Sequence, residues 1–244
     1  ILVNEYKALL DAGEQKMADE KMTQALKMED KYFELTRDFV RLHPDNIFSA
    51  YISNIVKGES YEKGKELYSM LTPKMQTSYY GRSLKQNTDA LAISALGGPC
   101  PDFTATDESG NKISLNSQKG GIMVLDFWAS WCGPCRAEIP HLKEAYKEYS
   151  TKGVAFFSVS IDKDDAAWRK AMKEENMPWA QAQAPKAGKD VMKQYQFSGI
   201  PYILVLDEEG KIVAKNLRGK ALTDKLEELL SGKKKSVAMP AMGM

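Results

Sequence analysis

The chain has 244 residues, which is long for a single small α/β domain of roughly 100 to 150 residues, so two domains are expected. Its 34 basic and 33 acidic residues are interspersed and give a net charge of +1, which excludes the strongly charged surface of a nucleic-acid or anionic-membrane binder. No stretch reaches the ~18 consecutive apolar residues of a membrane span, and three cysteines are too few for a disulfide-stapled fold.

The first 95 residues have a helical pattern. Residues 4–42 contain no proline and one glycine, Gly13, and apolar residues recur at helical and heptad-like intervals, which predicts one long amphipathic helix. The residues on its apolar stripe are Met22, Leu26, Phe33 and Val40. Further helical patterns cover residues 46–56 and 60–71, with a weaker one at 78–95. We therefore predict an all-α N-terminal module over residues 1–95.

A glycine- and proline-containing segment at residues 96–99 predicts a hinge to a second domain at residues 96–231. There, strand and helix patterns alternate, which predicts a central mixed sheet covered by helices on both faces. Strands are expected in a hairpin at 103–115 and at 122–128, 154–161, 203–206 and 212–214; helices are expected at 136–149, 165–175, 188–196 and 222–230. The basic, methionine-containing tail, residues 232–244, is expected to be disordered.

The pentapeptide Trp131-Cys132-Gly133-Pro134-Cys135 lies where the apolar pattern of residues 121–128 gives way to a helix. Two thiols three residues apart at a helix start exchange electrons through a disulfide, which predicts a redox centre. The positive end of the helix dipole favours a thiolate, so we expect a lowered pKa at Cys132 and assign it the attacking role. Cys135, one turn inside the helix, is then expected to resolve the mixed disulfide.

The segment from Asp126 to Cys135 resembles the active-site segment of the thioredoxin superfamily. Pro140 falls where thioredoxins kink the active-site helix, and Gly199-Ile200-Pro201-Tyr202 resembles their cis-proline loop. Within the superfamily the sequence is most similar to TlpA-like and ResA-like thiol-disulfide oxidoreductases, over about residues 98–231. The features that carry this closer resemblance are Pro101-Asp102-Phe103, the run Arg136-Ala137-Glu138-Ile139-Pro140 and Val159-Ser160-Ile161-Asp162.

The resemblance implies a thioredoxin-like fold after a helical region, and an enzyme that reduces protein disulfides without an organic cofactor or metal. Its implied partners are a disulfide-containing protein substrate and an external thiol electron donor. The implied location is outside the cytoplasm, in a periplasm or on the outer face of a bacterial membrane. Because the chain starts at Ile1 and not at methionine, we expect a processed or trimmed chain, with membrane association only through an anchor that preceded Ile1.

The resemblance also implies roles for two carboxylates. Asp126 interrupts an apolar strand, where burial raises the pKa of a carboxyl group, and it matches the thioredoxin aspartate that accepts the proton of the resolving thiol. A hydrogen-bonded structural aspartate is the alternative. Glu138, one helical turn beyond Cys135, aligns with the active-site glutamate of ResA-like proteins, although a surface glutamate is the commoner interpretation. We hypothesise that Asp126 dominates and that Glu138 adjusts it.

The expected substrate-binding residues surround the dithiol. A cis peptide bond before Pro201 would leave the Ile200 backbone open to pair with an extended substrate segment, with its sulfur in line with Cys132. The other residues assigned to substrate binding are Trp131, Gly133 and Pro134.

Three alternatives stay open at this stage. The two cysteines match half of a zinc site, for which the only further candidate ligands are Cys100, His43 and His141. Thiol peroxidases share the fold, although Ala129 replaces the threonine that such enzymes have three residues before their cysteine. The third alternative is a binding scaffold or metallochaperone in which the helical region recruits a partner. Cys100 itself is expected to be a small buried hydrophobe, in preference to a third redox thiol.

Overall fold

The computed structural model describes residues 14–58, 60–118 and 120–237, together with Glu5, Ala8, Leu9 and Ala12. The chain divides into two compact units, one of Ile1–Ala95 with Tyr195–Phe197 and the other of Leu96–Gln194 with Ser198–Met244. Gly13, within the predicted long helix, and the tail beyond Val237 lie outside the described residues. Within the described part, no helix is both long and apolar enough to cross a bilayer.

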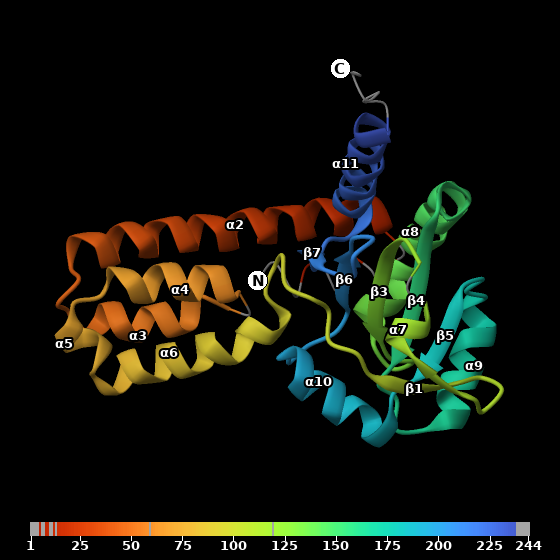
Figure 1. Ribbon diagram of the computed structural model, residues 1–244, viewed down its shortest axis with the longest axis horizontal. Helices are drawn as coiled ribbons and strands as arrows, with labels where there is room; N and C mark the ends of the chain where they lie inside the picture. The colour runs from red at the N-terminus through yellow and green to blue at the C-terminus, as the bar shows by residue number, and fades with distance from the viewer. Residues whose placement is uncertain are drawn as a thin grey trace, which may run out of the picture. The chain divides into compact units, whose positions relative to one another are not determined.

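The first unit is all-helical, as predicted (Figure 1). Its elements are α2 (Gln15–Leu42), α3 (Ile47–Val56), α4 (Tyr61–Met70), α5 (Pro73–Gln76) and α6 (Tyr79–Leu91), which ends in a 3-10 turn, η1 (Ala92–Ser94). Polar side chains accept backbone N–H groups at four helix starts, which fixes where the chain turns: Asn46, Ser60, Thr72 and Ser78. The four-residue helix α5 was not predicted because it is too short to show a period.

The core of this unit forms where α3 and α4 pack between α2 and α6. Its buried members are Phe33, Val40, Ala50, Leu67, Leu71, Met75 and Leu84. Two of the four residues predicted for the apolar stripe of α2 are therefore in the core. Leu26 is not, because it is 44% exposed.

The second unit has the predicted mixed sheet, with strands in the order β2-β1-β5-β4-β3-β6-β7. The strands are β1 (Thr104–Asp107), β2 (Lys112–Ser114), β3 (Ile122–Trp128), β4 (Val154–Ser160), β5 (Ala180–Gln183), β6 (Tyr202–Leu206) and β7 (Ile212–Lys215). The helices are α7 (Leu115–Gln118), α8 (Gly133–Tyr149), α9 (Asp165–Glu175), α10 (Lys189–Tyr195) and α11 (Gly219–Val237), with short 3-10 turns η2 (Ser150–Lys152) and η3 (Pro185–Gly188). At its centre β3 pairs in parallel with β4 and antiparallel with β6.

All seven residues of β3 are buried, as its unbroken apolar pattern predicts for a strand covered on both faces. Alternate residues of β3 and β4 form one core with α8 and α11, because side chains in a strand point to opposite faces in turn. The core residues from the strands are Ile122 and Val124 of β3, Val154 and Phe156 of β4, Ile203 and Val205 of β6, and Ala214 of β7. Asp126 is the next residue on this face of β3 and Ser158 the next on this face of β4, toward the end of the sheet that carries the cysteines.

Two predicted features of the second unit were wrong, and the predicted hinge segment makes backbone contacts that the sequence did not indicate. Strand β5 was not predicted, because its alanine and glutamine residues have low strand propensity. The expected hinge is bonded to the sheet: Gly97 N donates to Ile212 O at 2.8 Å, and Ile212 N donates to Gly98 O at 2.9 Å. Helix α11 runs to Val237 instead of ending at residue 230.

Candidate active site

Cys132 and Cys135 lie where β3 turns into α8 and are joined by a disulfide, so the structure is that of the oxidised protein. Cys132 is the N-cap residue of α8, and its Sγ accepts the backbone N–H of Cys135 at 3.2 Å. Pro134 stands at an early helical position, where its missing N–H costs no hydrogen bond. The sulfur of Cys132 therefore lies at the positive end of a 17-residue helix.

The loop that carries Cys132 is anchored by Asp162, at the end of β4. Ser130 donates to this carboxylate twice, from its backbone N at 2.8 Å and from its Oγ at 2.6 Å. Ser160 Oγ donates to the same carboxylate at 2.7 Å, and Asp162 is 2% exposed. Sequence reasoning used Asp162 only as part of a family resemblance and missed this role. The signal that points to it is an aspartate two residues after the end of a buried strand.

Around the dithiol the predicted substrate-binding residues come together. The peptide bond between Ile200 and Pro201 is cis, as predicted, and the Ile200 carbonyl oxygen lies 3.7 Å from Cys132 Sγ. Trp131 is 68% exposed, whereas Cys132 is 5% exposed. Gly133 is exposed and Pro134 half-buried beside them. An exposed aromatic residue and an open backbone segment thus flank the redox sulfur.

Asp126 is buried in β3, the strand that leads to the dithiol, and is 4% exposed. Desolvation by burial, helped by the nearby charge of Glu138, raises the pKa of its carboxyl group from 3.8 to about 7. A hydrogen bond from Ser158 Oγ to Asp126 Oδ2, of 3.0 Å, opposes this rise, as does the charge of Arg218. The buried carboxylate with a raised pKa that the sequence predicted is present.

Glu138 is 5% exposed, which makes the surface-glutamate interpretation wrong. Its Oε1 accepts the backbone N–H of Gly219 at 2.8 Å, and its Oε2 lies 3.3 Å from His141 Nδ1. Because Gly219 is the first residue of α11, Glu138 places its carboxylate at the N-terminus of that helix, where a negative charge is favourable. Glu138 therefore ties α8 to α11 directly beside the redox site.

Arg218 was missed by the sequence reasoning. Its Nη2 donates to the backbone oxygen of Pro201 at 3.0 Å, and its charge lowers the pKa of Asp126. Its Nε is buried without a hydrogen-bond partner. One guanidinium thus serves both the cis-proline loop and the buried carboxylate. Nothing in the sequence near residue 218 signals this, because the contact joins segments that are brought together only by the β6–β7 hairpin.

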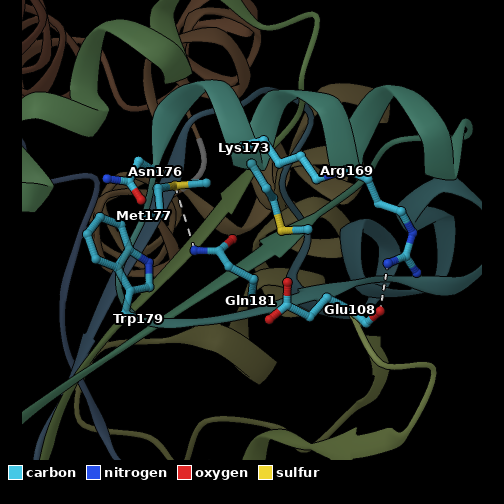
Figure 2. Close-up of a pocket in the computed structure, with 8 residues that line it drawn as sticks. Glu108, Arg169, Lys173, Asn176, Met177, Trp179 and Gln181 are labelled. Atoms are coloured by element: carbon cyan, nitrogen blue, oxygen red, sulfur yellow. Dashed lines mark hydrogen bonds between the residues drawn. The ribbon is translucent and has the colours of Figure 1, made fainter.

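A pocket of about 320 Å³ lies between α9 and β5 (Figure 2). It is lined by Glu108, Arg169, Met172, Lys173, Asn176, Met177, Trp179 and Gln181. None of the residues predicted for the redox site lines it. The reactive sulfurs lie instead next to Trp131 and the cis-proline loop. Cys100, 4% exposed, lies away from this pocket and is buried as predicted.

Comparison with known proteins agrees with this geometry. A model of the AhpC/TSA family matches residues 96–215. The chain is 33% identical over 135 residues to thiol-disulfide oxidoreductase ResA from Bacillus thuringiensis subsp. konkukian, an alignment that covers 55% of this chain and 76% of that protein. The family match begins where the second compact unit begins, so the helical unit lies outside it.

Solved structures give the same result. The thioredoxin domain of a thiol-disulfide oxidoreductase from Bacteroides vulgatus is 39% identical, with a TM-score of 0.54, and the match covers 56% of this chain and 98% of that one. A thiol:disulfide interchange protein from Bacteroides sp. is also 39% identical, with a TM-score of 0.55, covering 59% of this chain and 95% of that one. The chain therefore belongs to the ResA-like thiol-disulfide oxidoreductases with a thioredoxin-like fold, and it is an enzyme of thiol-disulfide exchange.

Proposed function

We propose that this enzyme reduces disulfides in protein substrates, with Cys132 as the attacking thiol and Cys135 as the resolving thiol. The observation that carries the proposal is the position of Cys132. Its sulfur lies at the start of α8, beside the Ile200 carbonyl and next to the exposed Trp131. That arrangement supplies a stabilised thiolate, a backbone edge and an apolar contact to one substrate disulfide.

In the first step the Cys132 thiolate attacks one sulfur of the substrate disulfide. A bond forms between Cys132 and that sulfur, the substrate S–S bond breaks, and the other substrate sulfur leaves as a thiolate that takes a proton from water. The N–H groups at the start of α8 stabilise the attacking thiolate; in the oxidised protein the Cys135 N–H already bonds this sulfur.

In the second step Cys135 loses its proton to Asp126 and attacks Cys132 Sγ. The mixed disulfide breaks, the substrate departs with its second thiol, and the enzyme is left with the Cys132–Cys135 disulfide found in the structure. A carboxyl group with a pKa of about 7 suits this transfer, because a base works best when its pKa is near the working pH. Glu138 adjusts this base through its charge, and an external thiol donor then reduces the enzyme.

The substrate segment binds in an extended conformation along the cis-proline loop. The Ile200 backbone pairs with it, the conformation at Pro201 holds that edge open, and Trp131, Gly133 and Pro134 form the adjoining docking surface. Arg218 supports the loop from within by its hydrogen bond to the Pro201 oxygen. We further propose an extracytoplasmic location, which the resemblance to ResA-like proteins supports.

Trapping tests the proposed substrate class. A Cys135→Ser variant performs the first step but cannot release the substrate, so it is expected to accumulate mixed disulfides between Cys132 and protein cysteines. The measurement is non-reducing electrophoresis and mass spectrometry after incubation with a mixture of disulfide-containing proteins. A Cys132→Ser/Cys135→Ser double variant is the matched control and should trap nothing. Equal adduct levels in both variants would refute the assignment of Cys132.

The proton acceptor is tested with the two carboxylates separately. Asp126→Asn is expected to slow release of substrate from the mixed disulfide by about a hundredfold or more near pH 7, because a positioned base contributes a factor of about 10² to 10⁴. Glu138→Gln is expected to have a smaller effect, because Glu138 acts by its charge on Asp126. The measurement is single-turnover reduction of a model disulfide as a function of pH. A larger loss in Glu138→Gln than in Asp126→Asn would reverse the assignment.

A further inference from the structure

The Asp126 carboxylate ends a chain of two buried hydrogen bonds that the mechanism above does not use. Ser158 Oγ donates to Asp126 Oδ2 at 3.0 Å, and Trp179 Nε1 donates to Ser158 Oγ at 2.8 Å. Asp126, Ser158 and Trp179 are 4%, 1% and 8% exposed. Asp126 and Ser158 are direct register partners of β3 and β4, so their side chains leave the sheet side by side.

The chemistry of the three groups fixes the direction of both hydrogen bonds. An indole N–H is a donor only, whereas a hydroxyl has one proton to donate and two lone pairs that accept. The indole N–H takes up one lone pair of Ser158 and cannot accept its proton, so when Asp126 is ionised the Ser158 hydroxyl donates to the carboxylate. A hydrogen bond donated to a carboxylate favours its charged form over its neutral form.

Trp179 is held firmly enough to act as a fixed donor. Its ring packs against Tyr146 of α8 and Phe156 of β4, with centroid distances of 5.5 and 5.9 Å. It precedes β5 and forms one wall of the pocket below α9, as Figure 2 shows. Its neighbours leave its N–H directed at Ser158, so the hydroxyl is oriented before any proton moves.

We propose that Ser158 and Trp179 are positioning residues of the redox site: Trp179 orients the Ser158 hydroxyl, and this hydroxyl stabilises the carboxylate form of Asp126. Two charged groups also face Asp126. Glu138 from α8 disfavours the carboxylate, and Arg218 from the segment before α11 favours it. Ser158 and Arg218 thus keep the carboxylate ready to accept a proton that burial alone would bind too tightly. The importance of this for catalysis rests on the proposed function of Asp126.

The test is a direct titration of Asp126 in the oxidised protein, in which Cys132 and Cys135 do not titrate. The measurement is NMR of ¹³C-labelled aspartate carboxyl groups, with the Asp126 signal assigned by its loss in Asp126→Asn. In Ser158→Ala the titration midpoint is expected to rise by about one pH unit. In Trp179→Phe it should rise by less, because the hydroxyl remains but is no longer oriented. The double variant should match Ser158→Ala alone.

Three controls separate positioning from packing. Trp168→Phe removes another buried indole N–H, at a residue 1% exposed whose Nε1 has no hydrogen-bond partner, and should leave the Asp126 midpoint unchanged. Ser158→Thr retains the hydroxyl and should restore a midpoint near that of the wild type. In the wild-type chain, the ¹H–¹⁵N signal of the Trp179 indole should shift with pH at the Asp126 midpoint and lose that shift in Asp126→Asn. This last readout requires no substitution at Ser158 or Trp179.

An unchanged or lower midpoint in Ser158→Ala would overturn the proposal. So would an effect of Trp179→Phe that persists in the Ser158→Ala background, or a wild-type indole signal that does not respond to pH. These results are independent of the proposed catalytic role. If Asp126→Asn left substrate release unchanged while the titrations behaved as expected, the role of Asp126 would fail and the hydrogen-bond chain would stand.

Discussion

Cys132→Ser is expected to abolish disulfide reduction. In an insulin reduction assay driven by dithiothreitol, the rate should fall to that of dithiothreitol alone, a loss of roughly three orders of magnitude or more for an enzyme deprived of its nucleophile. A serine hydroxyl at the same helix start is far too weakly acidic to form the corresponding anion. Cys135 is not expected to replace it, because Cys132 is the N-cap residue of α8 whereas Cys135 lies within the helix.

The matched control is Cys100→Ser. Cys100 is 4% exposed and lies beside the turn before β7, where its backbone N donates to Gly210 O at 2.9 Å. Its variant should retain the full rate, since no step proposed for the enzyme uses it. If Cys132→Ser were as active as the wild type, the binding-scaffold interpretation would gain support. A loss in Cys100→Ser alone, with the fold intact, would point to a third redox thiol.

The strand, the cysteine motif and the helix at the centre of the second unit could be predicted, because the sequence signals for all three are adjacent in the chain. The apolar run of β3, the Cys-Gly-Pro-Cys sequence and the helix formers that follow all lie within about 30 consecutive residues, and each signal agrees with the next. The strands toward the edge of the sheet were harder to predict from the sequence. Strand β5 depends on pairing with β1 and β4, not on its own residues, so single-sequence propensity could not find it.

The residues of the site differ in the same way: those near the cysteine motif in the sequence could be predicted, and those that reach the site through long-range contacts could not. Cys132, Cys135, Asp126 and Glu138 follow from strand and helix positions near one motif. Ser130 and Asp162 face each other across 32 residues, and Arg218 reaches Pro201 across 17. Such contacts are created by the crossing of chain segments in the folded protein and leave no spacing rule in the sequence. The role of Glu138 at the start of α11 was also unpredictable, since it depends on a backbone N–H 81 residues away.

The stability of the oxidised protein is expected to fall as pH rises from about 4 to about 7, and Asp126→Asn should remove most of this fall. Burial raises the pKa of Asp126 from 3.8 to about 7, so between these values the folded state binds a proton that the unfolded state has released. The unfolding free energy must therefore decrease with pH in that window and level off above it. A shift of this size corresponds to at most ~4 kcal/mol.

Asp126→Asn should thus be more stable than the wild type at pH 8 and close to it at pH 4, as measured by denaturant unfolding of the oxidised proteins. Glu144→Gln, an exposed carboxylate on the same helix as the cysteines, is the control and should leave the pH profile unchanged. Equal stabilities of Asp126→Asn and wild type at pH 8 would show that burial does not penalise the carboxylate. The desolvation that weakens the fold above pH 7 is the same desolvation that gives Asp126 its affinity for a proton. A variant that is more stable and slower at releasing substrate is therefore the expected signature of a buried base.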